Sequence, residues 1–520
     1  MIITPEVART LTELSHAIGR QIGLLVNRSG QIDSVIVGNG HEIVIPDLTD
    51  YRLGRKRLRG VRCLHTHLKN EPLTRDDLTD LALLRLDLMA AIGVRENGQP
   101  GLLSMAHLLP PNPENKPYEV FPSVDFYQFH LDFDPFIASL EREMERGLAA
   151  QVNLRDSREQ AILVSVSTKS RAVQEESLAE LRELARSDNV VVLDTVVQRP
   201  KEMHPKYLMG EGKIRELIIT SLQQGVTLLI FDRNLAPGQV KALGEITELK
   251  VIDRTQLILD IFARRAHSRD GKVQVELAQL KYLLPRLSER STALSRLTGG
   301  IGGRGPGETR LEVDRRRVKD KIARLEKELE QLSLARRERS SKRVKSGIPI
   351  VSIVGYTNVG KSTLLNALTE SQVHTEHLLF ATLDTTTRRL RFPQEREIII
   401  TDTVGFIQDL PPDLLGAFRP TLDELQDADL LIHLVDVSHP NFEQHVAAVN
   451  RILEDLKLHR MPQLLVFNKE DRMDPVEVKN LCRIHGAISV SAIHPETLPK
   501  LTSAIEERLW SPVSSVEAHK

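Results

Sequence analysis

Residues 355–362 read Gly355-Tyr356-Thr357-Asn358-Val359-Gly360-Lys361-Ser362, which matches the phosphate-binding pattern G-x-x-x-x-G-K-[ST]. The stretch follows an apolar run at 349–354 that predicts a strand, and it precedes a helical pattern over 363–368. In this context the loop amides surround the phosphates of a nucleotide, and the positive end of the helix adds to the attraction. We expect Lys361 to reach the β and γ phosphates. We expect the Ser362 hydroxyl to ligate Mg²⁺, which prefers oxygen ligands.

Three shorter motifs follow in the order expected of a GTP-binding domain: Asp402-Thr403-Val404-Gly405, Asn468-Lys469-Glu470-Asp471 and Ser491-Ala492. Each comes directly after a predicted strand. Asp402 can hold the Mg²⁺ shell, and the Gly405 amide can contact the γ phosphate. The Asp471 carboxylate can accept from N1–H and the 2-amino group of guanine, a donor pair that adenine lacks. Backbone amides of the last motif can contact the guanine oxygen, so the four motifs together predict a GTP site.

A further segment, between the first two motifs, predicts a magnesium switch: Phe380-Ala381-Thr382-Leu383-Asp384. A threonine hydroxyl in this segment completes the Mg²⁺ shell when the γ phosphate is present, so we expect Thr382 to be a metal ligand together with Ser362. The competing choices are Thr385, Thr386 and Thr387. A plain surface loop is the alternative for the whole segment.

The residue after the glycine of the second motif is Phe406. Many GTPases have a glutamine there that orients the attacking water, and a phenyl ring has no hydrogen-bonding group for this task. We therefore expect slow intrinsic hydrolysis and assign no catalytic residue. The catalytic group would come from a partner or from a rearranged switch.

The rest of the chain predicts an α/β protein with several domains. Short β-branched runs at 161–166, 190–197, 226–231 and 250–252 alternate with helical patterns at 178–186, 213–223 and 237–247, which is typical of a parallel α/β domain. We predict these parts: an extra module at 1–150, this α/β domain at 155–270, a helical hairpin at 271–345, a G domain at 348–510 and a tail at 511–520. Within the first part, we expect an amphipathic helix over 76–93. In the aromatic-rich stretch 118–136 we expect a strand that packs on its own core, and a partner-binding surface is the alternative.

The predicted hairpin is the basic part of the chain. Helical patterns at 273–287 and 310–343 flank a loop, 299–308, with six glycines in ten residues. Residues 304–345 contain fifteen Lys and Arg against eight Asp and Glu. We expect Arg304, Arg315, Arg316 and Arg317 to contact RNA phosphates, which makes binding dependent on salt. A solvated charged helix is the alternative.

Composition adds broad limits. The chain has 520 residues, which predicts about three or four domains. It is 41% hydrophobic and 27% charged, and its net charge of −1 carries no chain-wide sign of a nucleic-acid binder. Two cysteines exclude a disulfide scaffold, and no apolar stretch approaches the ~20 residues of a membrane span. We expect a cytoplasmic monomer, with a membrane-associated fraction as the alternative.

These motifs and several preceding stretches resemble the HflX family of ribosome-associated GTPases, which are related to translation factors. The matching residues, over about 155–510, are Gly210-Glu211-Gly212-Lys213 and the ranges 231–239, 251–266 and 299–308. One departure is Thr385, where the family usually has proline. The resemblance implies an α/β N-terminal domain, a helical hairpin and a G domain with GTP as substrate and Mg²⁺ as cofactor. It also implies binding to the large ribosomal subunit and its rRNA, and the splitting of stalled ribosomes under stress. A GTP-dependent adaptor for other proteins is the alternative.

Residues 1–150 lie outside that resemblance, and part of them is similar to the JAMM metalloproteases. His65-Thr66-His67, with Thr74 and Asp77, is similar to the zinc-binding pattern of those enzymes, although the spacing from His67 to Thr74 is one residue short. The place of the catalytic glutamate corresponds to Gln21, which cannot act as a general base. A degenerate JAMM-like domain, an unrelated α/β module and an active zinc peptidase domain fused to a regulatory GTPase are the three interpretations.

Overall fold

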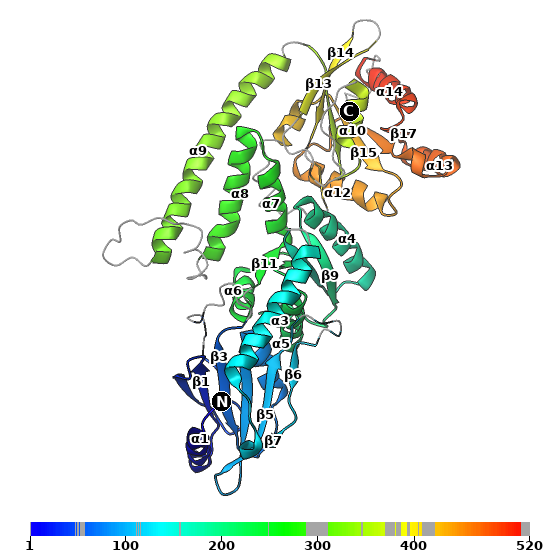
Figure 1. Ribbon diagram of the computed structural model, residues 1–520. Helices are drawn as coiled ribbons and strands as arrows, with labels where there is room; N and C mark the ends of the chain where they lie inside the picture. Colours follow the sequence, from blue (N-terminus) through cyan, green and yellow to red (C-terminus); the bar gives the residue numbers. More distant parts are fainter. Residues whose placement is uncertain are drawn as a thin grey trace. The chain divides into compact units, whose positions relative to one another are not determined.

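The computed structural model describes most of the chain in two units (Figure 1). The described residues are 2–46, 48, 51, 58–110, 112, 114, 116–154, 158–247, 249–287, 310–344, 347–369, 380, 386–392, 396–403, 405–407 and 422–510. The first unit comprises 1–174, 190–231 and 239–251, and the second comprises 175–189, 232–238 and 252–520. Each unit is described by itself.

The first unit begins with a mixed sheet whose strands have the order β2-β1-β3-β4-β5-β6, with β7 also paired to β5. The strands are β1 (Ile22–Asn27), β2 (Ile32–Val37), β3 (Val61–His67), β4 (Leu88–Val94), β5 (Pro100–Leu108), β6 (Tyr118–Val120) and β7 (Val124–Asp125). Only β3 and β4 pair in parallel among these strands. The helices are α1 (Pro5–Ile18), α2 (Arg75–Leu84) and α3 (Phe133–Leu154), so α3 crosses the predicted boundary at residue 150.

The prediction of one helix over 76–93 is wrong. Helix α2 ends at Leu84 because Arg85 takes a left-handed conformation (φ 55°) and its N–H bonds to the Leu81 carbonyl. The rest of the segment is β4, which lies between β3 and β5 and is buried along its whole length. A continuous apolar run fits such an interior strand, which periodicity alone cannot distinguish from a helix.

The prediction of one strand over 118–136 is also wrong. This stretch forms β6, β7, a 3₁₀ turn (η1, Phe126–Gln128) and the first residues of α3. Phe126 and Phe133 lie in the main core of the unit rather than in a core of their own. Asp125 accepts a hydrogen bond from the Tyr127 N–H, which ends the strand and starts the turn.

The predicted alternation of strands and helices after residue 155 is confirmed. Four strands form a sheet in the order β11-β10-β8-β9, and β8 pairs in parallel with both of its neighbours. The strands are β8 (Gln160–Val166), β9 (Val191–Gln198), β10 (Leu228–Phe231) and β11 (Lys250–Asp253). The helices between and after them are α4 (Arg171–Ser187), α5 (Glu211–Gln223), α6 (Pro237–Ile246) and α7 (Arg254–Arg265).

Two long helices of the second unit, α8 (Arg269–Leu287) and α9 (Arg310–Val344), pack together (Figure 1). Val273 and Leu277 of α8 are buried against Leu325 of α9. Ion pairs flank this seam, among them Arg269 with Glu328 at 2.8 Å. The helical patterns predicted at 273–287 and 310–343 therefore form helices that pack together, while the glycine-rich loop lies outside the described residues.

The G sheet completes the second unit. Its strands have the order β13-β14-β12-β15-β16-β17, and every pair is parallel except β13 with β14. They are β12 (Ile350–Gly355), β13 (Thr386–Arg391), β14 (Glu397–Asp402), β15 (Leu430–Asp436), β16 (Gln463–Asn468) and β17 (Ile488–Ser489). The helices are α10 (Lys361–Thr369), α12 (Phe442–Asp455), α13 (Pro475–His485) and α14 (Pro499–Trp510), with short 3₁₀ turns η4 (Asp423–Asp427), η5 (Glu470–Arg472) and η6 (Pro495–Thr497). None of the helices in the described parts of the chain has the length and apolar character needed to cross a membrane.

Candidate functional site

The four predicted motifs meet at one edge of the G sheet. The loop 355–362 follows β12, Asp402 ends β14, Asn468 ends β16, and Ser491 follows β17. These strands run in parallel, so their carboxyl ends share one edge, where open α/β sheets bind ligands. The four motifs, which are far apart in the sequence, therefore lie together at one site.

Two glycines shape the loop. Gly360 has φ 94°, and a Cβ there would come within 2.5 Å of Asn468 Nδ2. At Gly355, a Cβ would come within 2.3 Å of the Leu434 carbonyl oxygen. No other residue type fits at either position without moving its neighbours. Helix α10 then starts at Lys361, so its first N–H groups point back toward the loop.

The Lys361 ammonium is buried inside this loop. Its Nζ donates to the carbonyl oxygens of Tyr356 at 2.8 Å and Gly355 at 3.3 Å. Burial lowers the pKa of Lys361 to about 8. Among the described residues its hydrogen-bond partners are carbonyl groups, and the charge of Asp402 opposes the effect of burial only in part, so the ammonium suits the oxygens of a phosphate.

Ser362 and Asp402 offer the oxygen atoms that a magnesium ion prefers. The Ser362 hydroxyl donates to Asp402 Oδ2 at 2.6 Å, and Asp402 is only 1% exposed. The residues present therefore fit Mg²⁺ with a nucleotide. The other predicted ligand, Thr382, lies outside the described residues, as do Ala381, Leu383, Asp384 and Val404.

The residues after Asp402 are tied to the phosphate loop. Thr403 donates to the Ile353 carbonyl at 2.7 Å, and a Cβ on Gly405 would come within 2.9 Å of Lys361 Nζ. Phe406 forms a β-bridge with Tyr356, donates to the Gly355 carbonyl and accepts from the Thr357 N–H. Its side chain is 1% exposed, so the residue that stands in place of the usual glutamine is a packing residue.

The third and fourth motifs brace the other side of the site. Asn468 Nδ2 donates to the Val359 carbonyl at 2.7 Å, and Asn468 Oδ1 accepts from the Ala492 N–H at 2.9 Å. Lys469 Nζ donates to the Asn358 carbonyl at 2.9 Å. The Ser491 hydroxyl donates to Asp471 Oδ1 at 2.5 Å and so orients the carboxylate.

Glu470 and Phe380, two further residues of the predicted motifs, are held by contacts within the protein. Glu470 begins the short turn η5, and its N–H donates to the Val490 carbonyl at 3.3 Å. Phe380, the one described residue of the predicted switch segment, is 2% exposed and packs edge-on against Phe262 of α7. Its position is therefore fixed by packing.

A network that the motifs do not contain reaches the site through Tyr356. The Tyr356 ring stacks on His445 at 3.9 Å, and its hydroxyl donates to Glu180 Oε1 of α4 at 2.8 Å. The other oxygen of Glu180 pairs with the buried Arg254 at 2.7 Å, and Arg254 also pairs with Asp232 at 3.1 Å. The sequence contained one indication of this network, which is that Arg254 lies in the 251–266 stretch. The pairing itself was not predictable, because the partners are distant along the chain.

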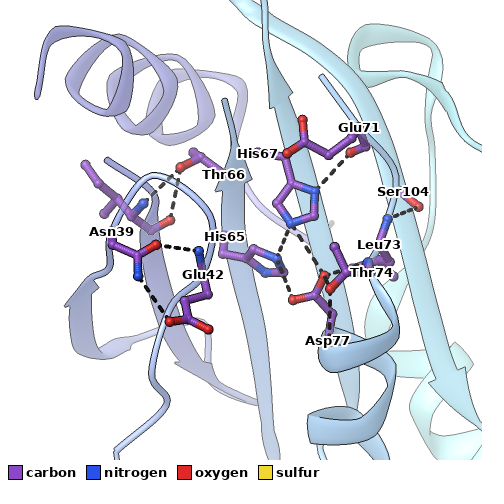
Figure 2. Close-up of polar contacts among 11 residues, drawn as sticks. Asn39, Glu42, His65, Thr66, His67, Glu71, Leu73, Thr74, Asp77 and Ser104 are labelled. Atoms are coloured by element: carbon purple, nitrogen blue, oxygen red, sulfur yellow. Dashed lines mark hydrogen bonds and ion pairs between the residues drawn. The ribbon is translucent and has the colours of Figure 1, made fainter. Parts of the chain in front are cut away.

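The residues singled out in the first 150 positions also lie together. His65 and His67 are at the end of β3, and Asp77 is in the first turn of α2 (Figure 2). Gln21, directly before β1, is 1% exposed.

Three protein-family models match the chain from residue 175 onward. "GTP-binding GTPase N-terminal" matches 175–263, "GTP-binding GTPase Middle Region" matches 265–343, and "50S ribosome-binding GTPase" matches 350–469. The chain is 47% identical over 335 residues to "GTPase HflX" of Alkalihalophilus pseudofirmus, covering 64% of this chain and 79% of that protein. It is 42% identical over 363 residues to "GTPase HflX" of Escherichia coli, covering 69% of this chain and 85% of that protein.

A similar solved structure is that of a GTP-binding protein from the archaeon Sulfolobus solfataricus in complex with GDP. It is 25% identical to this chain, the match covers 67% of this chain and 99% of that one, and the TM-score is 0.39.

Replacing Glu180 with alanine is expected to destabilise the second unit. The substitution leaves the buried Arg254 with one carboxylate instead of two and removes the partner of the Tyr356 hydroxyl. Losing one member of a buried charge network costs about 3 kcal/mol, which lowers the thermal midpoint by roughly 5–10 °C. Circular dichroism melts measure this shift. Glu183→Ala, on the same helix, is the matched control, and equal midpoints for the two variants would contradict the structural role of the network.

Proposed function

Because the chain belongs to the HflX family of GTPases and is a GTP hydrolase, we propose that it binds the large ribosomal subunit and uses GTP to split stalled ribosomes under stress. The observation that carries this proposal is the meeting of four motifs at one edge of the G sheet. The matched model "50S ribosome-binding GTPase" supports the choice of the ribosome as partner. A passive GTP-dependent adaptor is the competing function, and the sedimentation experiment below separates the two.

In this proposal the phosphates lie in the loop 355–362, with Lys361 at the β and γ phosphates. Ser362 and Thr382 ligate Mg²⁺, which neutralises phosphate charge. Guanine pairs with Asp471, whose carboxylate Ser491 orients from the adjacent loop. Lys361 supports this assignment most directly, because the described chain gives its buried ammonium two carbonyl partners and a phosphate supplies the missing negative charge.

The proposed RNA contact is formed by the basic residues of α9 together with Arg304, which lies outside the described residues. Arg315, Arg316 and Arg317 are all exposed on α9, where phosphate oxygens can reach them. The seam with α8 occupies the apolar side of α9, and these three arginines are not part of it. The glycine-rich stretch 299–308 lies outside the described residues, and its small side chains suit a narrow RNA channel, which bulky segments cannot enter.

Exchanging Asp471 for asparagine is expected to change the base that the site accepts. The amide oxygen can still accept from N1–H, but the amide N–H faces the 2-amino donor, so one hydrogen bond to a charged group, about 1.5–3 kcal/mol, is lost and GTP should bind at least ~10-fold more weakly. Xanthosine triphosphate, which has a carbonyl in place of the 2-amino group, should bind better to the variant than to the parent. Calorimetric titration of both nucleotides checks this. Asp474→Asn, which caps α13 instead, should leave GTP affinity unchanged, and an unaltered base preference in Asp471→Asn would refute the assignment.

The isolated chain is expected to hydrolyse GTP slowly, because the buried Phe406 cannot orient water. Intrinsic rates of GTPases that act without an activating partner are on the order of 10⁻⁴–10⁻² per second. Single-turnover hydrolysis of labelled GTP measures the rate, with Lys361→Ala as the control for contaminating activity. Large ribosomal subunits should accelerate the reaction. A rate above about 1 per second for the chain alone would contradict this expectation.

Charge reversal on the arm is expected to weaken ribosome binding. In sedimentation with large subunits, Arg315→Glu combined with Arg317→Glu should reduce co-pelleting and flatten its dependence on salt, because two phosphate contacts are lost. Deleting 299–307 should reduce binding or splitting as well. The control reverses two exposed charges of the G domain, Lys479→Glu with Arg483→Glu on α13.

The nucleotide dependence of the same sedimentation profiles separates splitting from passive adaptation. With GTP or a non-hydrolysable analogue, whole ribosomes should shift toward separate subunits, and with GDP they should remain intact. Co-pelleting without any shift toward subunits would favour the adaptor, while unchanged profiles for both arm variants would refute the RNA contact.

A further inference from the structure

A buried cluster of two imidazoles and one carboxylate lies in the first unit, outside the nucleotide site. His65 and His67 are two residues apart on β3, so their side chains leave the same face of the sheet. Thr66, which is labelled in Figure 2, lies between them and faces the other side. It bonds to the Ser15 hydroxyl and accepts from the Ile22 N–H. Asp77 reaches the same point from the first turn of α2.

The three side chains aim their metal-binding atoms at one point. His65 Nε2 lies 2.9 Å from His67 Nε2 and 3.2 Å from Asp77 Oδ1, and His67 Nε2 lies 3.5 Å from Asp77 Oδ2. Ligands about 2.0–2.1 Å from a tetrahedral ion are roughly 3.3 Å apart, so the observed separations bracket the spacing that a zinc ion requires. In the described residues, this is the one group of three or more such side chains whose ligand atoms come this close together.

Neighbouring groups hold two of the three side chains in this orientation. His67 Nδ1 lies 3.0 Å from the carbonyl oxygen of Glu71, which turns Nε2 toward the cluster. Asp77 Oδ2 accepts from the Thr74 N–H and from the Thr74 hydroxyl, both at 2.7 Å. Such outer hydrogen bonds to ligand side chains are typical of metal sites, where they fix the tautomer and the ring orientation.

Burial makes the cluster costly without an ion. The side chains of His65 and His67 are 0% and 1% exposed, and that of Asp77 is 14% exposed. The Nε2 atoms of two neutral imidazoles that face each other can share one hydrogen bond at most, with one Nε2 as donor and the other as acceptor. This single hydrogen bond does not satisfy both nitrogens and the Asp77 carboxylate at the same time. A divalent cation satisfies both nitrogens and the carboxylate together.

We propose that His65, His67 and Asp77 bind one divalent transition-metal ion, with zinc as the preferred ion. Two imidazole nitrogens and one carboxylate oxygen favour zinc over magnesium, which takes oxygen ligands in octahedral geometry. Three protein ligands leave one tetrahedral position for water or for an added ligand. This site lies in the first unit, and its ligands are distinct from those proposed for GTP and Mg²⁺.

Metal analysis of the full chain tests this site. The chain is treated with a chelator, reloaded with Zn²⁺ in the presence of Mg²⁺ and GDP, desalted and measured by mass spectrometry of the metal. The parent protein should retain about one zinc per chain, the stoichiometry of a single three-ligand site. His65→Ala and His67→Ala should retain at least tenfold less. Asp76→Ala changes the exposed carboxylate beside Asp77 and should behave like the parent.

Two further measurements test the site even if the alanine variants fold poorly. Asp77→Asn keeps a capping group for α2 and should bind zinc at least tenfold more weakly, while its circular dichroism matches the parent. Co²⁺ added to the parent should give the visible absorption of a four-coordinate ion with nitrogen ligands, and this absorption should be absent in Asp77→Asn. A parent protein without retained zinc and without this absorption would overturn the proposal, as would equal zinc retention in the parent and all three ligand variants.

Discussion

The side-chain amide of Asn468 is the interaction on which the rest of the G domain's site depends. It donates to the carbonyl of Val359 in the phosphate loop and accepts from the N–H of Ala492 beyond β17. Asn468 is 2% exposed, so both backbone groups would be left buried and unpaired without it. The same contact requires glycine at 360, where a Cβ would overlap the amide. The phosphate side and the base side of the site therefore have one shared support, which fixes their separation before a ligand binds.

Buried charge has two different roles in the second unit. Arg254 is neutralised by Glu180 and Asp232, so its charge serves the packing of the protein itself. Lys361 is equally buried but donates to backbone carbonyls, which do not neutralise an ammonium. The first charge has two carboxylate partners, whereas the hydrogen bonds described for Lys361 go to carbonyl groups, and the nearby Asp402 only partly opposes the effect of burial on its pKa. This contrast supports the proposed role of Lys361 on electrostatic grounds, in addition to the sequence motif.

Local patterns predicted much of this fold because many elements are specified locally. The strands and helices after residue 155 alternate with short links, and each predicted strand of the G domain forms within a few residues of its expected place. Prediction was wrong where tertiary position decides the structure. The run after Leu84 is apolar enough for a helix, and only its place between β3 and β5 makes it a strand. The contact of Tyr356 with Glu180 was not predictable for a related reason, since 176 residues separate the pair and neither side chain carries a local signal.

The candidate sites differ in the same way. The motifs predicted which residues meet at the nucleotide site, because parallel strands place every following loop at one edge. They did not predict that Phe406 pairs with Tyr356 of the phosphate loop in a β-bridge. The residue at the position of the usual glutamine therefore has a structural contact with the loop. The sequence pattern already grouped His65, His67 and Asp77, and the structure adds the distances and the burial of the cluster. The two-residue spacing on β3 placed both imidazoles on one face, but the capping turn of α2 is what brings Asp77 within reach of them. The ligand types then separate the two sites chemically: hydroxyl and carboxylate oxygens in the G domain select a hard ion, and two imidazoles in the first unit select a borderline one. The site proposed for Mg²⁺ and the site proposed for zinc therefore differ in their ligands, because the two imidazoles of the second favour zinc over a hard ion.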